Sequence, residues 1–344
     1  MKHANVAVFV PHIGCSHRCS FCDQQMITGR QRGPTPQEVC DAAQTALTSL
    51  GEDAANAEIA FFGGSFTAVD SVYRRSLLEA AYPYVHDGLF AGIRLSTRPD
   101  AIDDEILDEL CHYGVTTVEL GAQSMDDAVL YRNGRGHTAA QVCAAAQSIT
   151  ARGLRLGLQM MTGLPGDTPQ GALQTAARFA ALRPAEVRIY PTIVLPGTQL
   201  AQWYRAGTYQ PETLEEAVSL CAELLSFFEE RSIRVIRLGL HASPQLEKER
   251  LAGPWHPAFR ELCESRRWLC RLQRALREKP HGTYHFTVPE KQLSQAKGQK
   301  KANLSALETM GWHVEISAGG QFHLLESAGP ASKKETCMHA DSLT

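Results

Sequence analysis

The sequence predicts an α/β fold in which parallel strands alternate with helices, followed by a small α+β extension at the C-terminal end. Strand-like apolar runs alternate with helical patterns through the first 240 of the 344 residues. Turns rich in glycine and small polar residues follow those runs, and beyond Gly239 the alternation stops. Six or seven strand–helix units with right-handed crossovers imply a parallel sheet, either a barrel or a doubly wound sheet.

The predicted strands are short runs of mostly β-branched and other apolar residues. They cover residues 5–10, 58–62, 92–96, 115–120, 154–160, 186–190 and 233–238. The helices between them place apolar residues at helical spacing. They cover residues 35–50, 71–82, 103–113, 138–152, 170–182 and 214–230.

The C-terminal part has a different pattern. It predicts a basic helix over 258–278, a strand over 284–288, a helix over 299–308 and a hairpin of 312–317 with 321–325. We therefore divide the chain into a strand–helix domain over 1–240, a basic extension over 241–325 and a disordered tail over 326–344, which has no periodicity.

The composition is that of a folded protein of the cytoplasm. Hydrophobic residues make up 44% and charged residues 21%, which excludes a wholly disordered chain. No apolar run reaches the roughly 18 residues of a membrane-spanning helix, and the first residues lack the features of a signal peptide, so we expect no membrane partner. Ten cysteines in a reducing compartment indicate buried thiols or metal chemistry rather than disulfides.

Charge is distributed unevenly along the chain. Residues 1–230 hold 16 Lys and Arg against 26 Asp and Glu, whereas residues 231–301 hold 16 against 6. The basic segment predicts either a phosphate-binding surface or a solvated, arginine-rich helix face. Trp268 lies among the arginines of the predicted basic helix and fits either a base-stacking platform or a core contact.

The strongest chemical signal is the cysteine motif Cys15-Ser-His-Arg-Cys19-Ser-Phe-Cys22, directly after the first predicted strand. Three thiolates from one loop are soft ligands for zinc or for an iron–sulfur cluster. A structural zinc site normally has four protein ligands, so His12 or His17 would have to complete it. A 4Fe–4S cluster on three cysteines instead leaves one iron for an exogenous ligand, which makes a reactive site.

Small and polar residues follow the other predicted strands as well. They form the segments 63–65, 96–100, 121–124, 162–166 and 191–197. Because the C-terminal ends of parallel strands meet at one edge of a sheet, we expect these segments to line a single site. Glycine at that edge lets backbone N–H groups approach a ligand closely.

These motifs resemble those of the radical SAM superfamily, and in particular the radical SAM domain of the Elongator catalytic subunit and its short bacterial relatives. The cysteine motif, with Phe21, matches the C-x3-C-x-aromatic-C signature, and Gly63-Gly64-Ser65 matches a GGE-type strand with serine in place of the acidic residue. The segments that carry the closer likeness are PHIGCSHRCSFC, FFGGSFT, RLSTRPDAI, ELGAQSMDD, RGHT and TGLPGDT, with a weaker match in VPEKQLSQAKGQKKAN. The resemblance covers roughly residues 5–240 and implies a partial (β/α)6-type TIM barrel.

The resemblance also implies two cofactors and the residues that bind them. Cys15, Cys19 and Cys22 would hold a 4Fe–4S cluster, and S-adenosylmethionine (SAM) would chelate the fourth iron. The implied SAM-binding residues are Gly63, Gly64, Ser65, Ser96, Gln123, Arg135 and Gln159. Residues 190–193 would lie near the adenine. The planar fork of Arg135 suits a carboxylate.

The implied activity is reductive cleavage of SAM to a 5′-deoxyadenosyl radical, which abstracts hydrogen from a substrate. This activity requires an external electron donor, and the cluster that it uses would be oxygen-sensitive. The Elongator subunit modifies the wobble uridine of tRNA, so RNA is one candidate substrate, bound through residues 231–301. We expect no acetyltransferase domain after residue 240, because too few residues follow and they carry no acetyl-CoA-type glycine loop, and we expect no basic extension before Asn5.

Because of those two expectations, two alternatives stay open beside an RNA-modifying enzyme. One is a radical SAM enzyme that acts on a small molecule or a peptide, and the other is a non-catalytic iron–sulfur or zinc protein. His241 and Tyr190 are placed where they would reach a substrate, although either residue type is more often part of a core or rim. Cys263 and Cys270, seven residues apart on the predicted basic helix, receive no role.

Overall fold

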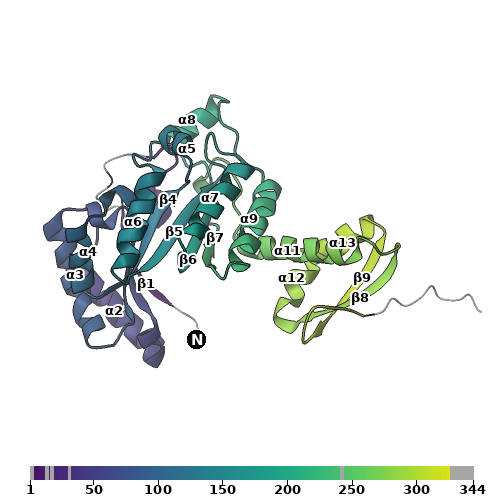
Figure 1. Ribbon diagram of the computed structural model, residues 1–344, viewed down its shortest axis with the longest axis horizontal. Coiled ribbons are helices and arrows are strands. Elements are labelled where there is room, and N and C mark those ends of the chain that lie inside the picture. Colours follow the sequence, from purple (N-terminus) through teal and green to yellow (C-terminus); the bar gives the residue numbers. More distant parts are fainter. Residues whose placement is uncertain (1–3, 12–14, 16–18, 30–31, 241–243, 326–344) are drawn as a thin grey trace, which may run out of the picture. The chain divides into compact units, whose positions relative to one another are not determined.

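Seven parallel strands form the main sheet of the computed structural model, which describes residues 4–11, 15, 19–29, 32–240 and 244–325 (Figure 1). The strands lie in chain order, and each pairs in parallel with its neighbours. They are β1 Asn5–Val10, β2 Glu58–Gly63, β3 Gly92–Thr97, β4 Val115–Gln123, β5 Arg155–Thr162, β6 Glu186–Pro191 and β7 Arg234–Leu238. The sheet curls into a half-barrel, which confirms the predicted partial TIM barrel, and its seven strands correspond to the seven strands predicted from the sequence.

Helices form the crossovers between the strands. The long ones are α2 Pro36–Leu50, α3 Ser71–His86, α4 Asp104–His112, α6 Ala139–Ala151, α7 Pro169–Ala181 and α9 Leu214–Glu229. In Figure 1 helices α6, α7 and α9 lie along the strands on one face of the sheet. Each long helix follows a threonine or aspartate whose side chain accepts a backbone N–H, as Thr35 accepts from Glu38 at 3.2 Å. Such caps determine where the helices begin.

Shorter helices follow the C-terminal ends of several strands. They are α1 Gln24–Thr28, α5 Asp127–Arg132, α8 Gln199–Arg205 and α10 Pro244–Glu249. Single 3-10 turns occur at η1 Gly51–Asn56, η2 Phe66–Ala68, η3 Pro99–Ala101, η4 Glu290–Gln292 and η5 Gln299–Lys301. Within the part of the chain that the structure describes, no helix is both long and apolar enough to cross a membrane.

The two faces of the sheet differ in polarity. Apolar residues such as Leu95 are fully buried on the face that the helices cover. Arg94, the neighbour of Leu95 in β3, points the other way and pairs with Glu186 of β6, three strands along the sheet, so these side chains meet across the concave inner face. Arg94 also lies 3.3 Å from Glu58 and 3.6 Å from Glu119. Because a lone buried charge is costly, this pairing is what permits charged residues there.

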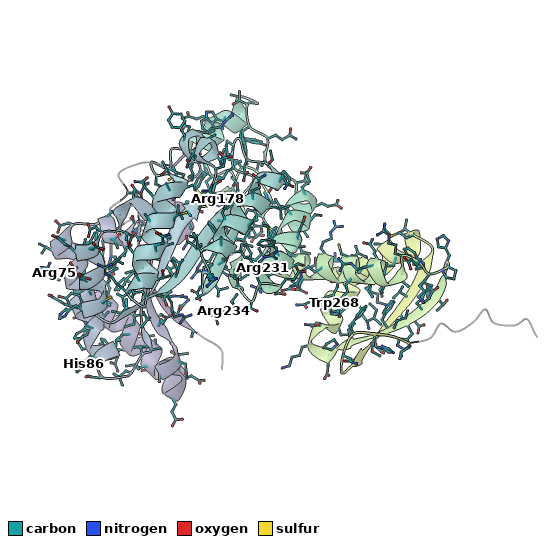
Figure 2. All side chains as sticks on the ribbon, in the orientation of Figure 1. Arg75, His86, Arg178, Arg231, Arg234 and Trp268 are labelled. Atoms are coloured by element: carbon teal, nitrogen blue, oxygen red, sulfur yellow. The ribbon has the colours of Figure 1, made fainter. Side chains whose placement is uncertain are left out.

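Further arginines complete this inner-face ion network. Arg234 of β7, labelled in Figure 2, reaches Glu186 at 2.9 Å. Arg188 of β6 donates two hydrogen bonds to Glu119, at 2.5 and 2.8 Å. Gly157 of β5 leaves room for the same carboxylate, because a Cβ there would lie 2.8 Å from Cγ of Glu119. A network of ion pairs therefore lines the inner face of the half-barrel.

The chain divides into two compact units after Phe259, whereas the sequence analysis divides it after residue 240. Residues 244–259 belong to the first unit because they pack on its loops. Leu246 is buried against Leu195, which follows β6. The predicted tail over 326–344 lies outside the described residues.

The second unit packs helices on a three-stranded sheet. Its elements are α11 Phe259–Leu276, β8 Gly282–Pro289, α12 Leu293–Lys297, α13 Ala302–Thr309, β9 Trp312–Gly319 and β10 His323–Leu325. Trp268 of α11, labelled in Figure 2, is buried in the core of this unit at 6% exposure. The guanidinium of Arg271 covers its ring at 4.9 Å from the ring centre. Trp268 is thus a core contact and is not free to stack on a base.

The predicted hairpin of β9 with β10 is wrong. β8 is the central strand, with β9 parallel on one edge and β10 antiparallel on the other. The reason is Phe322, whose ring stacks on Phe286 of β8 with centres 5.4 Å apart and also meets Trp268 edge-on. Burial of this aromatic side chain draws the chain past β8 to its far edge.

Candidate functional site

One pocket collects nearly all of the residues that the sequence placed in a site. The residues that line it are Cys15, Cys19, Phe21, Cys22, Gln24, Gly63, Gly64, Ser96, Thr97, Arg98, Gly121, Gln123, Arg135 and Gln159. They come from the loop after β1 and from the C-terminal ends of β2 to β5, together with the turn after α5. Of the segments that we expected to share one site, 63–65, 96–100 and 121–124 contribute residues to this pocket. Segments 162–166 and 190–197 contribute none, and neither does Ser65.

The cysteine loop is held between two short helices. The backbone N–H of Ser20 donates to the carbonyl of Asn133 at 3.1 Å, and its hydroxyl donates to Oδ1 of the same asparagine at 2.8 Å. On the other side, the N–H of Leu200 in α8 donates to the carbonyl of Ser20 at 2.7 Å. Phe21 is buried with Leu200 and with Val129 of α5. These contacts fix the segment that carries Cys19 and Cys22 at the edge of the sheet.

Each of the three thiols has a polar neighbour. The backbone N–H of Ser65 donates to the sulfur of Cys15, Arg135 Nη1 donates to Cys19 Sγ at 2.9 Å, and Gln24 Nε2 donates to Cys22 Sγ at 3.5 Å. Burial, together with the neighbouring Cys19 and Cys15, raises the pKa of Cys22 to about 12. Without a bound cation the Cys22 thiol stays protonated, so a positively charged metal centre is what would convert it to a thiolate.

The three thiols line one pocket, and among the described residues no group of three or more His, Cys, Asp and Glu side chains is placed to hold a single metal ion. Zinc needs every ligand within about 2.3 Å of one centre. In an iron–sulfur cluster each iron takes its own thiolate, so the thiolates stand apart around a larger group. His12 and His17, which would complete a zinc site, lie outside the described residues.

Two glycines bring the backbone to the pocket. Gly63 has φ +119°, which a residue with a side chain rarely adopts, and a Cβ there would lie 2.8 Å from the carbonyl oxygen of Val10. The next N–H, of Gly64, donates to that same oxygen at 2.7 Å. Strand β2 therefore ends in a turn that lies directly on β1, with bare main chain facing the pocket.

Gln123 and Arg135 meet at the end of β4. Gln123 is in the left-handed region, with φ +67°, where an irregularity of the β4–β5 register turns its amide into the pocket. Arg135 is 6% exposed and donates to the carbonyl of Gly121 as well as to Cys19. The Nε of Arg135 and the Oε1 of Gln123 are buried and have no hydrogen-bond partner among the described residues.

Two family models match this chain. The radical SAM superfamily model matches residues 9–179, and the radical SAM C-terminal domain model matches residues 184–268. The chain belongs to the radical SAM superfamily.

Its relatives include proteins of the Elongator type. The tRNA uridine(34) acetyltransferase of Dehalococcoides mccartyi (strain CBDB1) is 26% identical over 306 residues, which cover 78% of this chain and 66% of that protein. Elongator complex protein 3 of Homo sapiens is 28% identical over 200 residues, which cover 52% of this chain and 37% of that protein. This radical SAM chain thus spans about two thirds of the bacterial relative and little more than a third of the human one.

A solved structure supports the fold. The archaeal Methanocaldococcus infernus Elp3 with an N-terminal deletion superposes with a TM-score of 0.62 at 20% identity, covering 81% of this chain and 64% of that one. At this identity the likeness concerns the fold of the radical SAM chain and says nothing of its chemistry.

The two serines that the sequence placed in the site, Ser65 and Ser96, lie differently with respect to the pocket. The side chain of Ser65 is fully buried away from the pocket, where its hydroxyl lies 2.8 Å from Thr97 Oγ1 and accepts the N–H of Arg98 at 3.2 Å. Ser96 does line the pocket, and its hydroxyl accepts from Gln159 Nε2 at 3.1 Å. Gln159 also donates to Glu119 at 2.9 Å, which connects this wall to the inner-face ion network.

Sequence reasoning gave no individual role to several residues of the site. Thr97 and Arg98, inside the expected 96–100 segment, line the pocket together with Gln24, which was not singled out. Asn133, also not singled out, anchors the cysteine loop. Arg98 stands inside the RLSTRPDAI segment, and its place directly after a strand was the available signal. His241 lies outside the described residues. Cys263 is buried and Cys270 exposed, so the two do not share an open face of α11.

Proposed function

We propose that this radical SAM chain binds a 4Fe–4S cluster and SAM in the pocket and acts as a hydrogen-abstracting enzyme. When bound, the reduced cluster and SAM supply a 5′-deoxyadenosyl radical. The observation that carries the proposal is the convergence of three thiols with unpartnered buried polar groups in one pocket of a radical SAM half-barrel. An external electron donor and a reducing, cytoplasmic setting belong to this proposal.

The residues of the chain divide the work of binding. Cys15, Cys19 and Cys22 hold the cluster. The methionyl ammonium is bound by the unpartnered Oε1 of Gln123, which accepts a hydrogen bond, and by the bare main chain at Gly63 and Gly64, which allows it to approach closely. Arg135 faces the methionyl carboxylate. Ser96 and Gln159, which hydrogen-bond to one another, present hydroxyl and amide groups to the ribose.

The pocket also protects a reactive species from water. Ser96, Gln123 and Arg135 are each less than a tenth exposed, and Phe21 closes the side that faces α5 and α8. A dry site strengthens polar interactions with the bound cofactor and prevents side reactions of a radical. The chain therefore contributes position and exclusion of solvent, and the bound cofactors contribute the chemistry.

RNA, with tRNA as the first candidate, is the substrate we propose. The relatives' names refer to tRNA uridine(34). In this chain residues 260–325 hold 11 Lys and Arg against 6 Asp and Glu. Lys300 and Lys301 are exposed and both adopt left-handed backbone conformations, with φ +53° and +64°, which a side chain disfavours. Strained backbone conformations of this kind are often found at functional sites, and here the turn would present two lysine ammonium groups to the phosphates of an RNA.

The first experiment measures SAM cleavage. The full chain is reconstituted anaerobically with iron and sulfide, dithionite and SAM are added, and 5′-deoxyadenosine is quantified. The triple variant C15A/C19A/C22A is expected to lose both bound iron and product, whereas C270A, at an exposed thiol outside the pocket, keeps both. Product formation by the triple variant would refute the proposal.

The second experiment addresses the substrate. Binding of tRNA is measured across a range of salt concentrations for the wild type, K300E and K248E, the last at an exposed lysine of α10. K300E is expected to weaken binding and to lower the slope of log affinity against log salt by about one. Equal behaviour of K300E and K248E would contradict this surface. Undetectable tRNA binding by the wild type would favour a small-molecule or peptide substrate.

A further inference from the structure

Arg98 lies in the same pocket as Arg135 and has no assigned role. It follows β3 at the C-terminal edge of the sheet, lines the pocket and is 5% exposed. Its backbone is fixed at the end of the strand by the hydrogen bond from its N–H to the hydroxyl of Ser65. The main chain thus holds this arginine at a defined place on the wall.

The hydrogen bonds of its guanidinium leave one nitrogen unused. Nε and Nη2 donate to the two carboxylate oxygens of Asp100, both at 2.9 Å, and Nη2 donates a second time, to the carbonyl of Arg135 at 2.6 Å. A guanidinium has five N–H groups. Three are used, and the two on Nη1, which is buried, have no partner among the described residues.

Buried donors of a charged group are almost always satisfied in a folded protein. Asp100 and the Arg135 carbonyl lock the guanidinium in place, so rotation of the side chain cannot bring Nη1 to another acceptor without breaking three bonds. A group that enters the pocket and carries an acceptor would satisfy Nη1 without disturbing these bonds.

The pocket shows which kind of acceptor this is. Its lining holds two arginines and no aspartate or glutamate. Arg135 Nε is a second buried donor without a partner, and Gln123 Oε1 is a buried acceptor without one. Two guanidinium donors and one amide oxygen complement a carboxylate with an adjacent ammonium, which is the amino-acid end of SAM.

We propose that Arg98 is a second carboxylate-binding residue, whose Nη1 donates to the methionyl carboxylate of SAM beside Arg135, with Asp100 as the residue that positions it. This inference rests on the proposed SAM site. It adds that the two arginines act together and that the RLSTRPDAI segment carries its Arg and Asp as one unit.

The test compares two ligands on the iron-loaded chain. Dissociation constants for SAM and for decarboxylated SAM are measured anaerobically by equilibrium dialysis for the wild type, R98Q, R98K and D100N, with bound iron determined for each. R74Q is the matched control, because Arg74 is also buried and bidentate to a carboxylate, Glu109, but each of its three guanidinium nitrogens donates to an acceptor and it lies outside the pocket.

We expect R98Q to weaken SAM binding at least about ten-fold, the effect of a lost charged hydrogen bond. D100N and R98K should weaken it less, R74Q should leave it within about two-fold, and all variants should bind decarboxylated SAM like the wild type. D100N and R98K keep the inference testable if R98Q fails to fold.

Several outcomes would overturn the role of Arg98. They are unchanged SAM affinity in R98Q, equal losses for both ligands, or a shifted cluster reduction potential with unchanged SAM affinity, which would place Nη1 on the cluster instead. If the iron-loaded wild type itself fails to bind SAM, the proposed function fails, and that result is distinct from the others.

Discussion

Asn133 connects three parts of the site, and its truncation to alanine is expected to loosen the cysteine loop. Its side chain is fully buried. Oδ1 accepts from the Ser20 hydroxyl at 2.8 Å, and Nδ2 donates to the carbonyls of Val129 and Pro165 at 2.8 and 3.0 Å. Asn133→Ala removes all three bonds, whereas the backbone contact with Ser20 remains.

The expected cost is about 3 kcal/mol in the free energy of unfolding of the first unit, from about 1 kcal/mol for each of three buried hydrogen bonds. That is a large share of the roughly 5–15 kcal/mol that stabilises a typical domain. The lost bonds anchor Ser20 between two of the cysteines that we propose to bind the cluster. Because a binding site loses affinity when its ligands are less well ordered, the iron retained after anaerobic reconstitution should fall by about half or more.

The assay is urea denaturation of the metal-free chain together with iron analysis of the reconstituted chain. Asn303→Ala is the matched control, since Asn303 of the second unit is also buried and donates to three carbonyls, at 2.9, 3.0 and 3.2 Å. It should destabilise the second unit and leave iron binding unchanged. Full iron loading in Asn133→Ala, or an equal loss of iron in both variants, would refute the reasoning.

The remaining predictions concern pH, a glycine and a core aromatic. Burial lowers the pKa of His137 to about 4 and raises that of Asp167 to about 6. Between pH 4 and 6.5 the unfolded chain therefore binds a proton at His137 more readily than the folded chain does, and the contribution of His137 to the free energy of unfolding rises with pH. Asp167 acts in the opposite direction. Between about pH 4 and 6 the folded chain keeps its proton, so the contribution of Asp167 to the free energy of unfolding falls as pH rises. Relative to the wild type, D167N should thus show a steeper rise of unfolding free energy with pH and H137Q a shallower one, measured by urea denaturation at pH 4.5 and 6.5; the reverse order would contradict both assignments. G63A should lower stability by more than about 2 kcal/mol, since it combines an unfavourable φ with a backbone clash, while G88A, with φ +72° and open space around it, should cost only about 1 kcal/mol; equal thermal shifts would show that the clash is relieved. W268A should destabilise the second unit by about 3–5 kcal/mol and leave SAM binding intact, as checked by calorimetry and dialysis.

The order of strands and helices followed from the sequence because each apolar run is bounded by turn residues. The first strand, over residues 5–10, is the same in the sequence analysis and in the structure. Helices α5 and α8 were not predicted, because they are six and seven residues long and their buried sides pack on the cysteine loop rather than on the sheet. Periodicity cannot register a contact partner that lies far away in the chain.

The position of the site was predictable, but its hydrogen bonds were not. Parallel strands end at a common edge, which is why Gly63, Gln123 and Gln159 could be brought together by topology alone. Whether Ser65 or Thr97 faces the pocket depends on how each strand end turns, and that is decided by bonds such as the one between their two hydroxyls. The wrong prediction of a hairpin between β9 and β10 had the same origin, since Phe322 packs on Phe286 of β8 and not on the strand that precedes its own turn.

The ion network on the inner face constrains how this half-barrel can change over evolutionary time. Arg94 faces three carboxylates from β2, β4 and β6, so a single substitution of it would take one buried cation away from all three, in a site that water does not reach. Replacing a whole buried ion cluster by apolar residues is often tolerated, whereas removing one member is strongly destabilising. Descendants of this sequence are therefore expected to keep Arg94, Glu58, Glu119 and Glu186 together or to lose them together, because the intermediate steps are the least stable members of the series.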